Sequence, residues 1–186
     1  LAEVLRRTDL FTYGTTRSTN AIVTGNIAKT AFLTTEGFPD VLVLREGGKF
    51  NPHDLSQPFP KPYVPRRYTF EIAGRINSQG EVVRPLDESK IGVVIEQLRA
   101  KRFEAIAISL FWATANAAHE KRLAEMISTA LPDVPFTVSH ELNPILREYR
   151  RGSSVAIDAS LKPLMQTHLR ELEADLRRVT NRLQRK

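Results

Sequence analysis

Apolar and polar residues follow two different periods along the chain, and these periods predict where strands and helices lie. The near-continuous apolar run Phe103–Phe111 and the segment Lys29–Thr35 are typical of strands that are buried on both faces. Pro135–Val138 is predicted as a further strand. The short apolar run Val41–Leu44 fits a helix or a strand equally well, because periodicity does not separate the two over so few residues.

A hairpin is predicted in the middle of the chain. Apolar and polar side chains alternate from Tyr68 to Ile76, which indicates one half-buried strand. Asn77–Gly80 has the composition of a turn, and Glu81–Arg84 is expected to return as the second strand. Residues 45–66 are rich in proline and are predicted to form a long irregular loop, and loops of this length often carry function.

Apolar residues at helical spacing lie on both sides of the run Phe103–Phe111. Asp87 is predicted to cap the first of these helices, whose apolar stripe is formed by Ile91, Val94, Ile95 and Leu98. Asn116 is predicted to cap the second, whose inward face is formed by Leu123, Met126, Ile127 and Leu131. The order helix, strand, helix, strand predicts right-handed crossovers and a mainly parallel sheet.

Helical spacing continues from Ser139 to the end of the chain. The tract 139–186 is predicted to be helical, with a break or kink at Gly152, because glycine destabilises a helix interior by about 1 kcal/mol relative to alanine. At the other end, Leu1, Val4 and Leu5 are expected to be the end of another helix. These elements predict the class α/β, with a mainly parallel sheet, flanking helices and a long carboxy-terminal helical tract.

The formal net charge of +6 suggests nucleic-acid binding as a first hypothesis. Much of this charge lies in the helical tract and at its end, where cations suit the helix dipole. No nucleic-acid motif accompanies it, so no nucleic-acid partner is expected. The chain has no cysteine, which excludes disulfides. No apolar run approaches the roughly 18 residues of a membrane span, and there is no leader pattern, so we expect a cytoplasmic protein without membrane contact.

The stretch Phe11–Ala21 combines the features of a ligand-binding turn. Leu10, Phe11 and Tyr13 are predicted to form a short buried strand, followed by a turn at Gly14 and a hydroxyl-rich helix start. Such a turn can present N–H groups and hydroxyls to an anion or an amide. In the alternative interpretation these hydroxyls are ordinary helix caps that need no ligand. The candidate binding residues are Gly14, Thr15, Thr16 and Asn20.

Two later pairs carry charged groups. Arg147 can hold a carboxylate or a phosphate through two parallel hydrogen bonds, with Glu148 beside it. Arg147, Glu148 and Arg151 are equally well spaced for ion pairs within one helix, and both interpretations stand. His119 and Glu120 can act as acid and base, but the helix dipole also explains Glu120, and we favour a structural role. No spacing typical of a metal site occurs, and no metal ligand is predicted.

Five stretches, in order, resemble one family. Tyr13–Ala21 has the sequence Tyr-Gly-Thr-Thr-Arg-Ser-Thr-Asn-Ala and is similar to the His-Gly-Thr-Thr-x-x-Thr-Asn-Ala motif of the hydantoinase A/5-oxoprolinase family. That family includes N-methylhydantoinases and subunits of acetone and acetophenone carboxylases. The resemblance identifies residues 1–186 as a single fragment from the interior of the family's amino-terminal domain. The other matching stretches are Leu33–Asp40, Pro65–Arg67, Asn116–Arg122 and Pro144–Tyr149.

The resemblance implies part of an actin/sugar-kinase-like (RNase H-like) ATPase fold. It implies that the full-length enzyme is an ATP-dependent hydrolase that activates a cyclic amide by phosphorylation. The alternatives are a subunit of an ATP-dependent ketone carboxylase and a non-catalytic domain that binds a partner subunit. ATP and Mg²⁺ are the implied cofactors of the full-length enzyme, with none expected on this fragment, which is expected to be inactive alone. The implied partners are the remaining parts of its chain, a hydantoinase B-type subunit or domain, and a small cyclic amide.

The chain departs from the family pattern at three positions. Tyr13 stands where the family has His, Ile145 where it has Glu, and Asp158 where it has Asn. The family's glycine-rich phosphate motif and its carboxy-terminal domain are expected to be missing from this fragment. The catalytic residues are therefore not assigned.

Overall fold

The computed structural model of the chain describes residues 4, 7–47, 49, 51 and 53–181. The helix end expected at Leu1, Val4 and Leu5 falls mostly outside these residues. Contacts divide the chain into two compact units, each of which is described by itself. Unit 1 comprises Leu1–Ile27 and Pro163–Lys186, and unit 2 comprises Ala28–Lys162.

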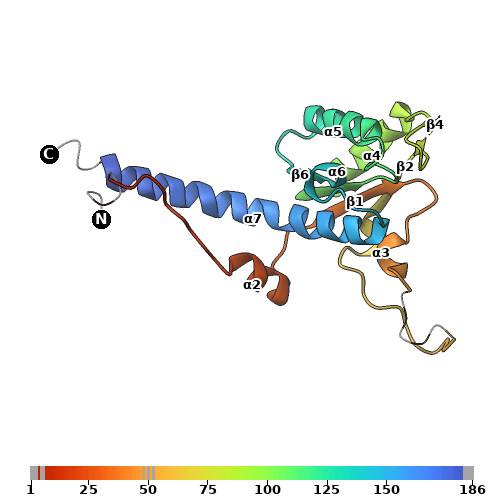
Figure 1. Cartoon of the computed structure of the whole chain (residues 1–186), viewed down its shortest axis with the longest axis horizontal. Helices are drawn as coiled ribbons and strands as arrows, with labels where there is room; N and C mark the ends of the chain where they lie inside the picture. Colours follow the sequence, from red (N-terminus) through yellow and green to blue (C-terminus); the bar gives the residue numbers. More distant parts are fainter. Residues whose placement is uncertain (1–3, 5–6, 48, 50, 52, 182–186) are drawn as a thin grey trace. The chain divides into compact units, whose positions relative to one another are not determined.

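A four-stranded parallel sheet forms the centre of unit 2 (Figure 1). Its strands are β1 (Thr30–Thr35), β2 (Thr69–Ile72), β5 (Ala105–Ser109) and β6 (Phe136–Val138), in the order β2-β1-β5-β6. All three neighbouring pairs are parallel, as predicted from the alternation of helices and strands. Every residue of β1 and β5 is buried, which confirms that these two apolar segments are central strands.

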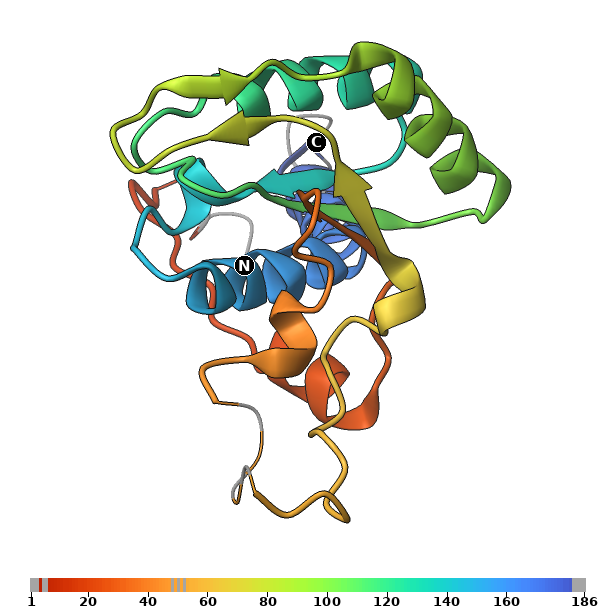
Figure 2. The same ribbon diagram turned by 90° about the vertical axis from the view of Figure 1, so that its right-hand side faces the viewer.

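Alternate residues of the central strands contribute to two separate hydrophobic cores. On one face, the strands pack against α4 (Glu88–Ala100) and α5 (Ala118–Ala130) through Ala31, Leu33, Ile106 and Ile108. On the other face, they pack against α3 (Val41–Leu44) and the first part of α7 through Phe32, Ala105 and Ala107. Figure 2 shows helices on both sides of the sheet, which is the arrangement expected of a parallel α/β sheet.

The helices α4 and α5 begin close to their predicted starts. Asp87 caps α4 as predicted, because its side chain accepts a hydrogen bond from the Lys90 N–H at 3.2 Å. Ala117, one residue after the predicted cap, is the N-cap of α5. Asn116 Oδ1 nevertheless accepts from the Ala118 N–H at 2.9 Å, so the side chain still satisfies the helix start.

The prediction of one strand from Tyr68 to Ile76 is wrong, because this segment forms two strands. β2 ends at Ile72 and belongs to the parallel sheet, whereas β3 (Arg75–Ile76) pairs with β4 (Val82–Arg84) in the predicted antiparallel hairpin. Gly74 lies between β2 and β3 with φ +154°, a backbone conformation that favours glycine. It turns the chain from one sheet into the other.

Val41–Leu44 is the helix α3, which decides the choice that the sequence left open. In 45–66, the described residues form no helix or strand before the 3₁₀ turn η1 (Arg66–Tyr68), as predicted for an irregular loop. Val64 of this loop is buried in the second core, whereas Leu55 is 90% exposed. The loop is therefore anchored at its end and exposed in its middle.

The helical tract consists of α6 (Ser139–Leu142) and α7 (Glu148–Asn181), and residues 182–186 lie outside the described part. The prediction of a break at Gly152 is wrong. The interruption lies at residues 143–147, where Pro144 lacks an N–H, and α7 is continuous through Gly152. A Cβ added at Gly152 would lie 3.0 Å from Phe32 Cζ, so the glycine allows the helix to approach the sheet.

In unit 1, the described structure contains α2 (Arg17–Thr24), the segment that precedes it and the second part of α7. The predicted buried strand is wrong: Leu10, Phe11 and Tyr13 are 81%, 52% and 42% exposed and pair with no described strand. A short apolar segment without a partner cannot form a ladder. The glycine-dependent turn is also wrong, because Gly14 has no positive φ. None of the helices in the described part combines the length and the apolarity needed to cross a bilayer.

Candidate functional site

The hydroxyl groups of residues 15 and 16 lie at the exposed start of α2 in unit 1. Thr16 is the N-cap by position, but its side chain makes no capping hydrogen bond. Thr15 Oγ1 accepts from the Arg17 N–H at 3.2 Å, and the Asn20 N–H donates to the Thr16 carbonyl at 2.9 Å. The capping interpretation therefore accounts for Thr15 but not for the Thr16 hydroxyl. Gly14 and Asn20 are exposed as well, and a binding role for these four residues stays a prediction.

His168 of α7 contacts this segment, which the sequence analysis missed. Tyr13 Oη lies 2.8 Å from His168 Nε2, and Arg17 Nη1 lies 3.2 Å from His168 Nδ1. Both imidazole nitrogens thus have a partner. Nothing in the local sequence indicates these contacts, because the partners are 155 and 151 residues apart. Tyr13, which replaces the histidine of the family motif, is therefore itself hydrogen-bonded to an imidazole.

In unit 2, the connections between the strands change direction at one point along the carboxyl edge of the sheet. From β1 the chain passes to β2 on one side, and then to β5 on the other side of β1. Open α/β sheets bind ligands at such a switch point, beyond the carboxyl ends of the strands. Here β1 and β5 end side by side, joined by a hydrogen bond of 2.9 Å from the Phe111 N–H to Thr35 Oγ1.

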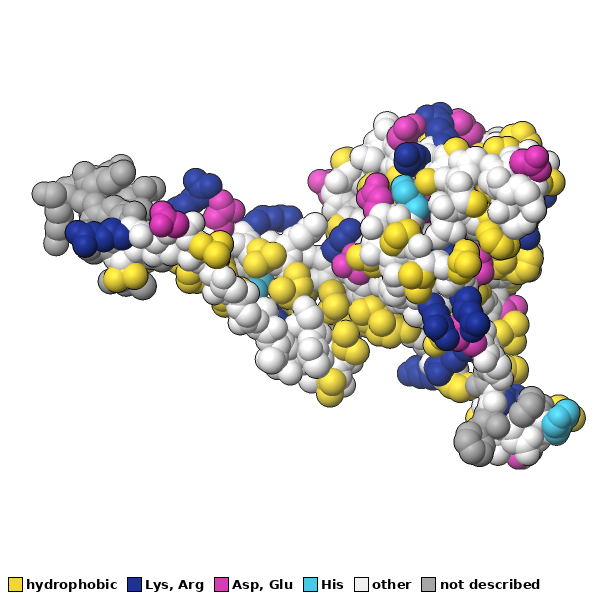
Figure 3. Space-filling model, viewed as in Figure 1, with side chains coloured by type: hydrophobic (Ala, Val, Ile, Leu, Met, Phe, Trp, Pro, Cys, Tyr) yellow, Lys and Arg dark blue, Asp and Glu magenta, His cyan; other side chains and the backbone are white. Residues whose placement is uncertain are grey.

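Two adjoining hollows, of about 260 Å³ and about 310 Å³, lie beyond these strand ends. They share Val41, Arg45 and Phe111, and together we call them the arginine hollow. Figure 3 shows basic side chains, with acidic ones among them, where the body of unit 2 meets the long loop. The other lining residues that matter for the chemistry are Phe38, Asp40, Glu46, Arg147, Glu148 and Tyr149.

Arg147 and Glu148 have different partners, and only Glu148 belongs to an ion pair within the helix. Glu148 Oε1 lies 3.5 Å from Arg151 Nη2, so this pair is the intrahelical one. Arg147 precedes the helix, its side chain is 66% exposed, and its Nη1 lies 3.6 Å from Glu46 Oε1. Arg150 binds Glu46 at 2.9 to 3.1 Å, and these hydrogen bonds hold the pKa of Glu46 below its ordinary value.

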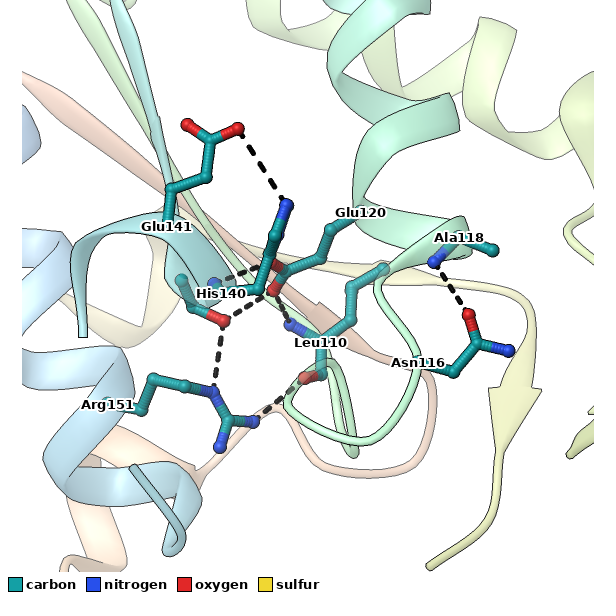
Figure 4. A network of polar contacts seen from close by, with 8 residues as sticks. Leu110, Asn116, Ala118, Glu120, His140, Glu141 and Arg151 are labelled. Atoms are coloured by element: carbon teal, nitrogen blue, oxygen red, sulfur yellow. Dashed lines mark hydrogen bonds and ion pairs between the residues drawn. The ribbon is translucent and has the colours of Figure 1, made fainter. Parts of the chain in front are cut away.

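A buried polar network fixes the start of α7 against the strand ends (Figure 4). Glu120 is fully buried and accepts hydrogen bonds from the Leu110 N–H, the Ser139 hydroxyl and the His140 N–H, and its Oε2 lies 2.7 Å from His140 Nδ1. Arg151, also fully buried, donates to Ser139 Oγ at 3.0 Å and to the Leu110 carbonyl at 2.9 Å. The carboxylate of Glu120 is fully engaged in this network, which is the arrangement expected of the structural role that we favoured.

A larger hollow, of about 630 Å³, lies where β4 leads into α4. Its basic side chains already have a partner, because Arg84 and Lys90 both form ion pairs with Glu36. The arginine hollow, which lies at the switch point of the parallel sheet, is the better candidate for a charged ligand. Among the residues that the structure describes, no three His, Cys, Asp or Glu side chains gather in a way that could hold a metal ion.

Comparisons with known sequences point to one family. The family model described as the hydantoinase/oxoprolinase N-terminal region matches residues 3–131. The caprolactamase subunit alpha of Pseudomonas jessenii is 37% identical over 175 residues, which cover 93% of this chain and 25% of that protein. The acetophenone carboxylase gamma subunit of Aromatoleum aromaticum is 31% identical over 180 residues, which cover 90% of this chain and 25% of that protein.

The fold is shared with a solved structure. The crystal structure of the ATP-dependent caprolactamase from Pseudomonas jessenii superimposes with a TM-score of 0.86 and 36% identity, over 96% of this chain and 26% of that one. The chain thus spans about a quarter of the length of these relatives.

Proposed function

Because the chain belongs to the hydantoinase/oxoprolinase family, we propose that the whole protein is an ATP-dependent hydrolase of cyclic amides. The similarity to a protein named caprolactamase supports this. Two relatives are named as subunits, so we also propose a second, hydantoinase B-type subunit as partner. The proposal includes an actin/sugar-kinase-like ATPase fold for the whole domain, ATP as cofactor and a place in the cytoplasm.

In this proposal, the residues at the start of α2 stabilise the charge that develops on the activated amide. ATP, when bound, would supply the phosphoryl group: phosphorylation of the amide oxygen makes the carbonyl carbon more electrophilic toward water, whose attack leads to cleavage of the ring C–N bond and release of phosphate. The Thr16 hydroxyl donates a hydrogen bond to the oxygen on which negative charge develops, and Gly14 N–H and Asn20 orient that oxygen. Thr15 accepts from Arg17 and keeps its own hydrogen for donation.

The observation that carries this assignment is the Thr16 hydroxyl, which is exposed and makes no capping bond. It can donate to a ligand without removing an interaction from the helix. The family resemblance also implies Mg²⁺, but the described residues of this chain do not fit a metal site. We therefore assign no metal ligand and no metal-dependent step to them.

The test measures ATP hydrolysis and melting temperature on the same preparation of the full-length protein, with a lactam as substrate. Thr16→Val is expected to lower turnover roughly a hundredfold, which is about 2.7 kcal/mol, and to leave the melting temperature unchanged because no cap is lost. Thr24→Val is the matched control. Its hydroxyl bonds to the Asn20 carbonyl at 2.8 Å within the same helix, so this variant should keep its turnover.

Two results would contradict the proposal. The first is a full-length protein that neither binds nor hydrolyses ATP in the presence of any lactam. The second is a Thr16→Val variant with the turnover of the wild type, which would remove the start of α2 from the site while leaving the family assignment intact.

A ketone carboxylase is the second candidate, because the chain is 31% identical to an acetophenone carboxylase gamma subunit. ATP hydrolysis that depends on a ketone and inorganic carbon, and does not respond to a lactam, would identify it. Silence with both substrates, together with stable binding of a partner subunit, would instead identify a non-catalytic interaction domain.

A further inference from the structure

We propose that the arginine hollow of unit 2 binds an anion, namely a carboxylate or a phosphate carried on a flat apolar body. Arg45 and Arg147 bind the charged group, and the aromatic wall of the hollow binds the apolar body. This inference does not depend on the proposed function, because a protein without lactam hydrolysis would still bind such an anion here.

Two acidic residues line the part of the hollow that contains Arg147, and both already pair with arginines other than Arg45 and Arg147. Glu46 accepts three hydrogen bonds from Arg150, at 2.9 to 3.1 Å. Glu148 lies 3.5 Å from the fully buried Arg151. Within the described part of the chain, Arg147 forms one ion pair, at 3.6 Å with Glu46, and the hydrogen-bond acceptors of Glu46 are already taken by Arg150. Its guanidinium therefore keeps most of its donors for a ligand.

Arg45, which lines both parts of the hollow, also has an unused donor. Its Nη2 donates to the Lys61 carbonyl at 3.0 Å, but its Nε is buried and has no acceptor among the residues that the structure describes. Asp40, the nearby acid, accepts instead from Arg66 Nε at 2.7 Å. A buried donor without an acceptor is costly, and a shift of the Arg45 side chain toward an anion in the hollow would supply one.

The backbone around the hollow is strained. Arg45 has φ +56° and ψ −139°, and Arg147 has φ +76°. Trp112, which follows the lining residue Phe111, has φ +58°. These are three of the four non-glycine residues with positive φ in the described part of the chain. Such strain persists where surrounding structure enforces it, and it gathers at binding sites.

The apolar part of the hollow suits a flat ligand. The rings of Phe38 and Phe111 have centroids 4.2 Å apart, and Phe38 is 40% exposed. The Arg75 guanidinium lies 4.9 Å and 5.3 Å from these two centroids. The wall therefore already stacks planar groups, and a further aromatic ring can extend it.

The experiment titrates the ¹⁵N-labelled chain with phenyl phosphate, benzoate and neutral benzyl alcohol, and follows the amide resonances of Phe111, Arg147 and Tyr149. Saturable shifts are expected with both anions, with a dissociation constant at least about tenfold higher for benzyl alcohol. The tighter of the two anions identifies phosphate or carboxylate as the preferred group. Absent or unsaturable shifts with both anions, or equal binding of benzyl alcohol, would overturn the proposal.

Arg147→Ala is expected to weaken the binding of the tighter anion roughly tenfold. Arg122→Ala is the matched control, since Arg122 is 49% exposed, pairs with Glu88 and lies outside the hollow. This control should bind as the wild type does. If Arg147→Ala does not fold, Arg147→Gly replaces it, because glycine fits φ +76°. Wild-type affinity in a folded Arg147 variant would refute the inference.

Discussion

At the scale of single residues, Arg147 places a positive charge in the arginine hollow, but its backbone is held in an unfavourable conformation. A non-glycine residue held at φ +76° carries strain of about 1 to 3 kcal/mol. The side chain gives little back, because its contact with Glu46 is 3.6 Å long and exposed. The stability of the fold therefore does not explain an arginine at this position, whereas the proposed recognition of an anion would.

Arg147→Gly separates the cost of the backbone conformation from the contribution of the side chain to anion binding. Glycine adopts the observed φ without strain, so the free energy of unfolding is expected to rise by about 1 kcal/mol while anion binding weakens. Urea unfolding and the phenyl phosphate titration measure the two effects. A variant less stable than the wild type would mean that Arg147 supports the fold through Glu46 after all.

His119 is a second single residue with a testable effect, because it makes the free energy of unfolding depend on pH. Burial lowers the pKa of His119 below its ordinary value of 6.5, whereas in the unfolded chain the imidazole takes up a proton near that value. Protonation thus favours unfolding, so this contribution is complete above about pH 6.5 and is lost as the pH falls below it. His119→Gln should remove this loss between about pH 7.5 and pH 5. The free energy of unfolding of both proteins is measured across that range, and an equal change with pH in the two proteins would refute the assignment.

At the scale of helices and strands, the sequence pattern predicts the elements that are determined by their own residues. β1 and β5 were found because strands buried on both faces need continuous apolar runs. The split at Gly74 was missed, because alternation continues through it and only the positive φ separates the two strands. The network around Glu120 was equally hidden, since its hydrogen bonds join residues 10, 19 and 20 positions apart that come together only when β5, α5 and α6 pack.

Two glycines in helices are expected to respond oppositely to the same substitution. Gly92→Ala in α4 meets nothing within 4 Å and should stabilise the protein by about 0.5 to 1 kcal/mol. Gly152→Ala gains the same helix propensity but brings its Cβ to 3.0 Å from the fully buried Phe32, so it should be less stable than Gly92→Ala by about 1 to 3 kcal/mol. Denaturant unfolding of both variants checks this difference. Equal gains would show that Phe32 moves aside freely.

At the scale of the whole molecule, both hydrophobic cores lie in unit 2. All four strands of the parallel sheet are there, and Val155, Ala156 and Ala159 of α7 close the second core before the unit ends at Lys162. Sequence reasoning did not predict this division, because α7 continues across the boundary without a break. It named Arg147 and Glu148, which line the arginine hollow, as candidates, but not Arg45, which lines the hollow only because the loop folds against the strand ends.

The fragment 28–162 is therefore expected to fold alone, because it retains the residues that cover both faces of the sheet. The amide resonances of β1 and β5 should coincide with those of the whole chain, and unfolding should remain cooperative. Poorly dispersed resonances would show that unit 1 is needed for the sheet to form.

The strained residue beside the arginine hollow also gives the protein an optical signal of its own. Trp112 is the single tryptophan of the chain, and it is partly buried directly after Phe111. Indole fluorescence changes in wavelength and intensity with the polarity of its surroundings, and here no second indole dilutes that change. Emission from the unlabelled 186-residue chain thus reports from one place, and rapid mixing with a ligand would resolve how fast the hollow fills and empties.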